Sequence, residues 1–148
     1  AGYLFAAGRA GERFAVRNSG AHVVVEGCGS NGCEYMTGGV AVLLGRIGAN
    51  FGAGMTGGMA YIYDPHGDAR RLLNTDSLVV GQLSHPHWES ELEELIERHA
   101  AETGSRKAAA ILQHWEAEKG LFLQLCPKEM LPHISHPLGF TAEAVPAE

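Results

Sequence analysis

MTGGVAVLLG (Met36–Gly45) is followed, nineteen residues further on, by MTGGMAYIYD (Met55–Asp64), so nearly the same phrase occurs twice. Two earlier segments align with this pair, GAHVVVEG (Gly20–Gly27) and AGYLFAAG (Ala1–Gly8), and successive units are offset by eighteen or nineteen residues. A repeat of this length cannot bury its own apolar face and has to stack on its neighbours. The repeat is therefore the feature that decides the fold.

Each unit contains an apolar stretch of about six residues, such as VAVLL or MAYIY, which is typical of a buried β-strand. Glycine-rich phrases separate the stretches, for example GCGSNG and GANFGAG. Stacking of such units predicts a mainly β protein, a single-stranded parallel β-helix, followed by two short α-helices. The alternative is a β-sandwich with glycine-rich hairpins, and the fixed period favours the β-helix.

The repeat is expected to need glycine where the chain turns with positive φ or where neighbouring turns approach too closely for a Cβ atom. Asn18, Asn31 and Asn50 are other residues that tolerate such turns. The glycines that we assign to the structural motif are Gly20, Gly27, Gly29, Gly32, Gly38, Gly39, Gly45, Gly52, Gly54, Gly57 and Gly58.

The composition changes near Gly67, because sixteen of the twenty glycines lie at or before it. We divide the chain into glycine-rich repeats at 1–81 and a helical extension at 82–148 that packs on them, within one structural domain. In the extension, a first apolar stripe stops before Gly104, and Ser105 caps a second helix that ends at Gly120. The two stripes consist of Trp88, Leu92, Leu95, Ile96 and His99, and of Ala108, Ile111, Leu112 and Trp115. The strand-like run LFLQLCP follows, and the tail from His133 is irregular.

GCGSNG at Gly27–Gly32 matches the G-x-G-x-x-G dinucleotide-binding pattern directly after a strand. That pattern binds a pyrophosphate only when a helix N-terminus follows, and here a glycine pair stands six residues further on. A second match, GAGMTG at Gly52–Gly57, also leads into a strand. Both matches are interpreted as products of glycine density, and we predict no cofactor-binding residue.

Cysteine, histidine and charged residues give no catalytic or metal-binding set. Cys28, Cys33 and Cys126 are expected to pack in the core, and the histidines of HPH (85–87) and HISH (133–136) lack further ligands at metal-binding spacing. Arg17, Glu26 and Glu34 are expected to form ion pairs between repeats. The acidic residues of the first helix are interpreted as a mostly solvated face: Glu89, Glu91, Glu93, Glu94 and Glu97.

Bulk properties exclude some classes of partner. The net charge is −6 and the chain contains no run of lysine or arginine, which argues against nucleic acid and anionic membrane surfaces. No apolar stretch is long enough for a membrane span. The odd number of cysteines is typical of a reduced, cytoplasmic protein.

The phrases RNSGAHVVVEGCG, NGCEYMTGG and NFGAGMTGG, together with ELEELIERHAAETGS and ILQHWE, closely resemble the C-terminal G-x-G-x-G domain of glutamate synthase large subunits over about residues 2–130. The resemblance implies a right-handed parallel β-helix that is a scaffold without catalytic residues. It also implies, for the full enzyme, an amidotransferase domain that releases ammonia from glutamine and an FMN-binding domain, with an iron–sulfur cluster, that converts 2-oxoglutarate to glutamate.

The resemblance implies that this chain binds no cofactor and has no activity alone, and that its partners are the amidotransferase and FMN-binding domains or subunits. A separately encoded β-helix subunit of a related multi-subunit amidotransferase or oxidoreductase, such as N-methylglutamate synthase, is the alternative. The matching region begins in mid-domain, so we also expect an open β-helix end through which copies of the chain can associate.

Overall fold

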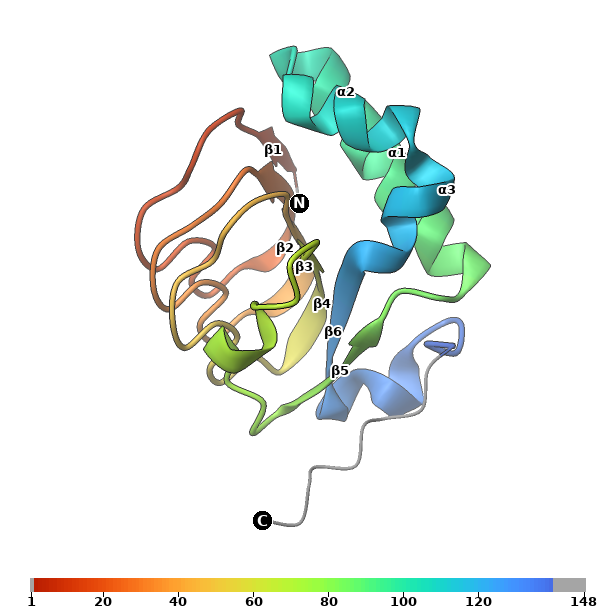
Figure 1. Cartoon of the computed structure of the whole chain (residues 1–148). Helices are drawn as coiled ribbons and strands as arrows, with labels where there is room; N and C mark the ends of the chain where they lie inside the picture. Colours follow the sequence, from red (N-terminus) through yellow and green to blue (C-terminus); the bar gives the residue numbers. More distant parts are fainter. Residues whose placement is uncertain (1, 140–148) are drawn as a thin grey trace.

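The computed structural model describes residues 2–139. Four strands of the repeat region run parallel, in the order of the sequence: β1 (Tyr3–Phe5), β2 (Ser19–Val25), β3 (Thr37–Leu43) and β4 (Gly57–Tyr63). Between them the chain forms stacked loops on one side of the sheet (Figure 1). The result is a solenoid-like β-helix of about three turns, as the repeat predicts, and not a β-sandwich.

The register between the strands reproduces the sequence repeat. Val24 of β2 pairs with Val42 of β3, eighteen residues later, and Val42 pairs with Tyr61 of β4, nineteen residues later. Because a strand alternates its side chains between two faces, equivalent positions of the repeat stack on the same face. Each repeat unit is thus one turn of the β-helix.

Two further strands extend the sheet with the opposite direction. β6 (Phe122–Pro127) pairs antiparallel with β4, and β5 (Leu78–Gln82) pairs antiparallel with β6, which gives the order β1-β2-β3-β4-β6-β5. The run LFLQLCP thus forms the strand that its sequence predicts. β5 was not expected from the sequence, and β6 from the C-terminal part lies between two strands of the first part.

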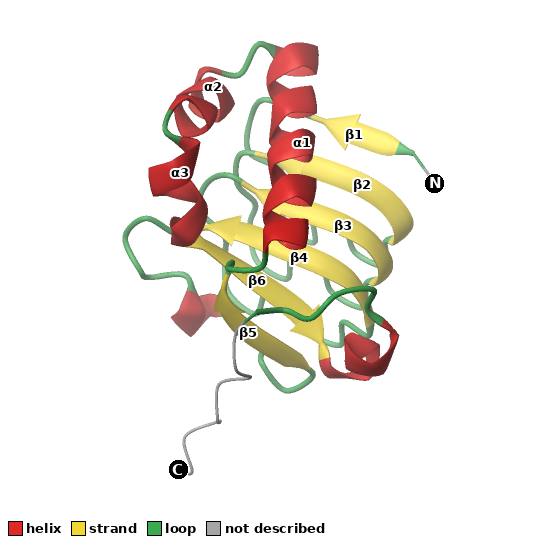
Figure 2. Ribbon diagram, turned by 90° about the vertical axis from the view of Figure 1, so that its right-hand side faces the viewer, coloured by secondary structure: helices red, strands yellow, loops and turns green. Residues whose placement is uncertain are grey.

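The helices cover the outer face of the sheet, and α1 crosses the parallel strands (Figure 2). α1 (Pro86–Thr103) ends at Gly104, which has φ 69°, as expected for a left-handed C-cap. Ser105 caps α2 (Arg106–Gln113), also as expected. The second predicted helix is wrong beyond that point, because the chain breaks at His114 (φ −119°, ψ 35°) and continues as α3 (Trp115–Glu118).

Three short 3₁₀ helices complete the described chain: η1 (Arg70–Leu72), η2 (Lys119–Leu121) and η3 (Lys128–His133). Of the tail that we expected to be irregular, residues 134–139 contain no regular element, whereas His133 still belongs to η3. The remainder of that expectation lies outside the described residues.

The sheet separates two hydrophobic cores. The inner core lies inside the solenoid and contains, among others, Val23, Val25, Cys28, Cys33, Met36, Ala41, Leu43, Phe51, Met55, Ala60 and Ile62. The outer core lies between the sheet and the helices and contains, among others, Val24, Val40, Val42, Met59, Tyr61, Trp88, Leu92, Ile96, Trp115, Phe122 and Cys126. Alternate residues of each strand therefore serve different cores.

Candidate functional site

The glycines of the repeat fit a structural role. A Cβ atom added to Gly57 would lie 2.0 Å from the carbonyl oxygen of Thr37, and one added to Gly45 would lie 2.1 Å from that of Glu26. Gly39 and Gly58 have φ values of 86° and 83°, where side chains are disfavoured. The close approaches and the positive φ values both occur where one turn of the β-helix packs on the next.

The two G-x-G-x-x-G matches have no helix after them. The segment after Gly32 forms a turn that leads into β3, and the segment after Gly57 is β4 itself. Neither match can therefore direct the free N–H groups of a helix N-terminus at a phosphate.

The three cysteines lie on two sides of the sheet. Cys28 and Cys33 are buried in the inner core and Cys126 in the outer core. Burial raises the pKa of all three thiols, for Cys126 to about 11. The three thiols cannot meet at one metal or iron–sulfur cluster, and within residues 2–139 no group of three or more His, Cys, Asp or Glu side chains could hold a metal ion.

A polar cluster that is largely enclosed joins the β-helix to the helices. Glu26, directly after β2, accepts hydrogen bonds from His99 Nε2 of α1 (3.0 Å) and from the Ser105 hydroxyl, and Ser105 also caps α2 by accepting from the Ala108 N–H (3.1 Å). The His99 side chain is completely buried, and its Nδ1 has no hydrogen-bond partner among the described residues. A carboxylate only accepts, so Nε2 carries the proton.

Burial raises the pKa of Glu26, but the hydrogen bonds from Ser105 and His99 outweigh it and hold the pKa below its ordinary value of 4.5. Glu26 is therefore ionised at neutral pH and stabilises the position of both helices. This cluster was not recognised from the sequence, in which His99 was one member of an apolar stripe and Ser105 only a cap.

Charged residues of the repeats pair differently from the sequence prediction. Glu34 pairs with Arg13 (3.4 Å), not with Arg17, and Glu26 pairs with His99 of α1. The two arginines lie at positions that both have positive φ, four residues apart. Of the three residues predicted to form ion pairs between repeats, only Glu34 does so among the described residues, and its partner is Arg13.

The acidic residues of α1 are less solvated than predicted. Glu91 accepts a hydrogen bond from the buried Tyr61 hydroxyl (3.0 Å), and Glu89 pairs with Lys119 (3.3 Å). Burial, together with Glu91, raises the pKa of Tyr61. These contacts attach the acidic face to β4 and η2, and of the five glutamates only Glu94 and Glu97 are exposed, whereas the other three are half-buried.

The histidines at both ends of the extension form an aromatic group. His87 and His136 stack with 3.6 Å between ring centroids, and His85 Nδ1 accepts the His87 N–H at the start of α1. The Trp88 indole donates to the Pro137 carbonyl (2.9 Å). These contacts attach residues 134–139 to α1, so the histidines have capping and packing functions here.

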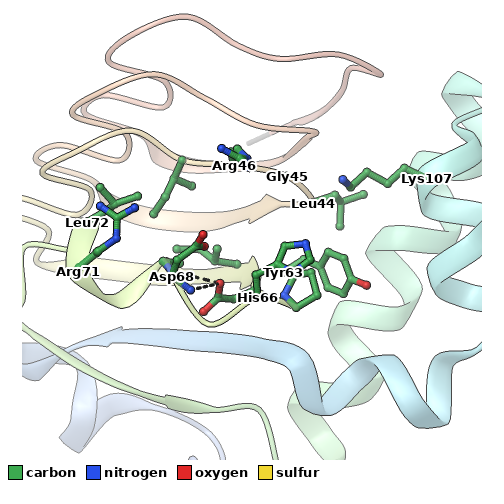
Figure 3. A pocket seen from close by; sticks show the side chains of 14 residues that line it. Leu44, Gly45, Arg46, Tyr63, His66, Asp68, Arg71, Leu72 and Lys107 are labelled. Atoms are coloured by element: carbon green, nitrogen blue, oxygen red, sulfur yellow. Dashed lines mark hydrogen bonds between the residues drawn. The ribbon is translucent and has the colours of Figure 1, made fainter.

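An open pocket lies at the end of the solenoid and has a cavity volume of about 300 Å³. Figure 3 shows Arg46, His66, Asp68, Arg71 and Lys107 around it. The pocket lies where β3 and β4 end, next to the start of α2. None of these residues was a candidate in the sequence.

Within the described residues, no helix is both long and apolar enough to cross a membrane.

The chain is similar in sequence to known proteins over most of its length. The model of the GXGXG motif family matches residues 1–128. The chain is 58% identical to the glutamate synthase [NADPH] large chain of Azospirillum brasilense over 138 residues, which are 93% of this chain and 9% of that protein. It is 52% identical to the ferredoxin-dependent glutamate synthase of Pyropia yezoensis and 50% identical to ferredoxin-dependent glutamate synthase 1 of Arabidopsis thaliana, each over 85% of this chain and 8% of the relative. The chain thus spans less than a tenth of the length of these relatives, and it belongs to the GXGXG motif family, as a domain of the glutamate synthase type.

Proposed function

We propose that this chain is the scaffold domain of a glutamate synthase and carries no catalytic residue of its own. The observation that carries the proposal is the 58% identity to a glutamate synthase large chain over 93% of this chain. The whole enzyme would convert glutamine and 2-oxoglutarate to two glutamates, in ammonia assimilation. This domain would contribute shape, while other domains perform the chemistry.

The contacts of the polar residues support a structural role. The cluster that most resembles a catalytic set, Glu26, His99 and Ser105, is enclosed between β2, α1 and α2 and places Glu26 between the other two side chains. A nucleophilic serine would need the histidine itself within hydrogen-bond reach. The cluster therefore fits a connection between the two layers better than it fits catalysis.

The cofactors of the whole enzyme would be bound elsewhere. FMN and an iron–sulfur cluster are expected in the full synthase, but the cysteines here are buried on opposite sides of one sheet and do not fit a cluster. The expected partners are the amidotransferase and FMN-binding domains or subunits. We place the protein in the cytoplasm, although a relative from Arabidopsis thaliana is described as chloroplastic/mitochondrial.

The N-terminal edge of the sheet is a candidate contact surface. β1 pairs only with β2 in the described sheet, and its Tyr3 and Leu4 side chains are 53% and 54% exposed. An exposed strand edge with apolar side chains favours pairing with another chain. We therefore propose that isolated copies associate through this end and bury at least roughly 1,000 Å². Sedimentation at tens of micromolar tests this, and a monomer at that concentration would exclude it.

The mass of the native polypeptide tests membership of a synthase. We would capture the protein that carries this sequence from its source cells and measure its mass under denaturing conditions. A polypeptide many times larger than 15.8 kDa is the expected result. A native chain near 15.8 kDa, captured with larger partners, would instead make it a separate subunit, for example of an N-methylglutamate synthase type of enzyme.

A further inference from the structure

In each turn of the solenoid the chain forms a corner directly after the strand. Backbone hydrogen bonds join successive corners, and this series of bonds is interrupted between the corner after β3 and the corner after β4. The corners after β1 and β2 each donate an equivalent backbone hydrogen bond to the corner of the next turn. The Ala10 N–H donates to the Gly27 carbonyl (2.8 Å), and the Cys28 N–H donates to the Arg46 carbonyl (2.9 Å). The repeat predicts the next bond from the Ile47 N–H to the carbonyl of residue 65. No such backbone bond exists among the described residues.

A second series of bonds stops at the same place. The Gly29 N–H donates to the Gly11 carbonyl (3.1 Å) and the Gly48 N–H to the Gly29 carbonyl (3.3 Å). In the next turn the corresponding N–H, that of Gly67, donates instead to the Asp64 carbonyl within its own loop (3.3 Å). The fourth corner therefore does not cover the third one.

Asp64 holds this last corner in its different shape. Its Oδ1 accepts the N–H groups of Asp68 (3.1 Å) and Ala69 (3.2 Å), so the loop closes on the Asp64 side chain and not on the previous turn. The pocket of about 300 Å³ lies beside the uncovered corner, and Gly45, Arg46 and Ile47 form part of its wall. It is thus the place that a regular fourth corner would fill.

The polar lining of this pocket, which we name the corner pocket, has three cationic side chains, two carboxylates and the imidazole of His66. Arg46, Arg71 and Lys107 line it, and none of the three makes an ion pair or side-chain hydrogen bond to another described residue, although the charge of Lys107 also helps to lower the pKa of Glu26. Asp64 and Asp68 also line it, but Asp64 is engaged by two backbone N–H groups. Figure 3 shows Lys107 approaching from the α2 side and Arg46 from the β3 side.

We propose that the corner pocket binds a small oxyanion, a carboxylate or a phosphate, of a free metabolite-sized ligand. The uncovered Ile47 N–H would donate to an anion oxygen, because the ladder directs it along the solenoid axis into the missing turn. Arg46, Arg71 and Lys107 would supply charge, and such charge-assisted hydrogen bonds are the stronger ones. The volume, at the lower end of the range for ligand pockets, suits a ligand of a few heavy atoms.

The test is a titration of this chain, followed by two-dimensional amide NMR, with inorganic phosphate and, separately, with succinate at constant ionic strength. A saturable shift of the Ile47 amide signal is expected for at least one probe, and the probe that binds more tightly identifies phosphate or carboxylate as the ligand class. The variant Lys107→Gln should weaken that binding at least about fivefold. Arg71→Gln should weaken it in the same direction, and both side chains are exposed.

Arg106→Gln is the matched control, because Arg106 lies next to Lys107 in the first turn of α2 but does not line the pocket. It should change the affinity by less than about twofold. The proposal is overturned if neither probe saturates the Ile47 shift. It is also overturned if Arg106→Gln weakens binding as much as Lys107→Gln, since the probes would then be adventitious ions attracted by diffuse surface charge.

Discussion

The inner and outer cores of this protein share one sheet but are specified in different ways. Inside the solenoid, neighbouring turns approach so closely that backbone atoms decide which residues fit, as the 2.0 Å separation between a Gly57 Cβ and the Thr37 oxygen illustrates. Outside, large side chains such as Trp88 and Leu92 fill the space between the sheet and the helices. The inner core therefore constrains the positions of glycines, whereas the outer core constrains side-chain volume and a few polar contacts.

The largest effect is expected for Gly57→Ala. The added methyl group would collide with the backbone of the neighbouring turn, which cannot move without breaking the ladder, so we expect a loss of about 3 kcal/mol or more in the free energy of unfolding. Gly11→Ala is the matched control, because nothing lies within 4 Å of a Cβ atom there and the change should be small. Urea unfolding measures both, and equal effects would contradict the close-approach explanation.

The outer core should respond to a loss of volume. Leu92 is completely buried between α1 and the sheet, so Leu92→Ala should lower the free energy of unfolding by about 3 kcal/mol. Leu131→Ala removes the same atoms from a residue that is 38% exposed, so it should lower the free energy of unfolding far less. If the two substitutions had similar effects in thermal or urea unfolding, the helices would not be packed as described.

The polar connection between the layers predicts a dependence on pH. The pKa of Glu26 is lower in the folded state than its ordinary value of 4.5, so its contribution is present above that pH and is lost as the pH falls through the folded pKa. Glu26→Gln should cost about 1–3 kcal/mol at neutral pH. Its difference from the wild type should shrink on acidification below pH 4.5, and a difference that grows there would contradict the assignment.

Glycine should also be favourable at some positions that lack it. Arg17 is exposed and has φ 57°, a conformation that costs an ordinary residue roughly 1–2 kcal/mol. Arg17→Gly relieves this strain but increases the entropy of the unfolded chain, so a net gain of about 0.5–1 kcal/mol is expected. Arg106→Gly, in the first turn of α2, should instead lower the free energy of unfolding. Chemical unfolding of both variants measures whether the two changes have opposite signs.

The rates of thiol labelling compare how readily the two cores open to solvent. All three cysteines are buried with raised pKa values, so none should react rapidly with a thiol reagent in the folded protein. Cys126 should react before Cys28 and Cys33, because side-chain contacts cover it, whereas the other two lie inside turns joined by backbone bonds. Mass spectrometry of partly labelled protein gives the order, and earlier labelling of Cys28 or Cys33 would reverse the comparison.

The repeat was predictable from the sequence because one period of eighteen or nineteen residues governs both the glycines and the strands. The turn conformations were only partly predictable. Asn31 and Asn50 have positive φ as expected, whereas Asn18 does not. Cys33 and Tyr35 also have positive φ, although their residue types disfavour it. Bonds to the neighbouring turns impose that conformation at these positions, for example from the Tyr35 N–H to the Ala53 carbonyl (2.8 Å).

Contacts between distant segments could not be read from local patterns. Glu26 and His99 are separated by 73 residues and meet only because α1 crosses the end of β2. The corner pocket results from the way Asp64 closes its own loop, which the repeat alone would not predict. β5 was missed because its assignment as a strand depends on β6, which follows it by forty residues.

The most direct test of the central claim, that these residues provide shape and not chemistry, is glutamine-dependent glutamate formation per mole of folded synthase. We would compare the wild type with Glu26→Gln in the synthase of which, as proposed, this chain is a part. The scaffold role predicts a smaller folded fraction with turnover unchanged within about twofold. A fall in turnover of about tenfold or more at an unchanged folded fraction would contradict it and make Glu26 part of the chemistry.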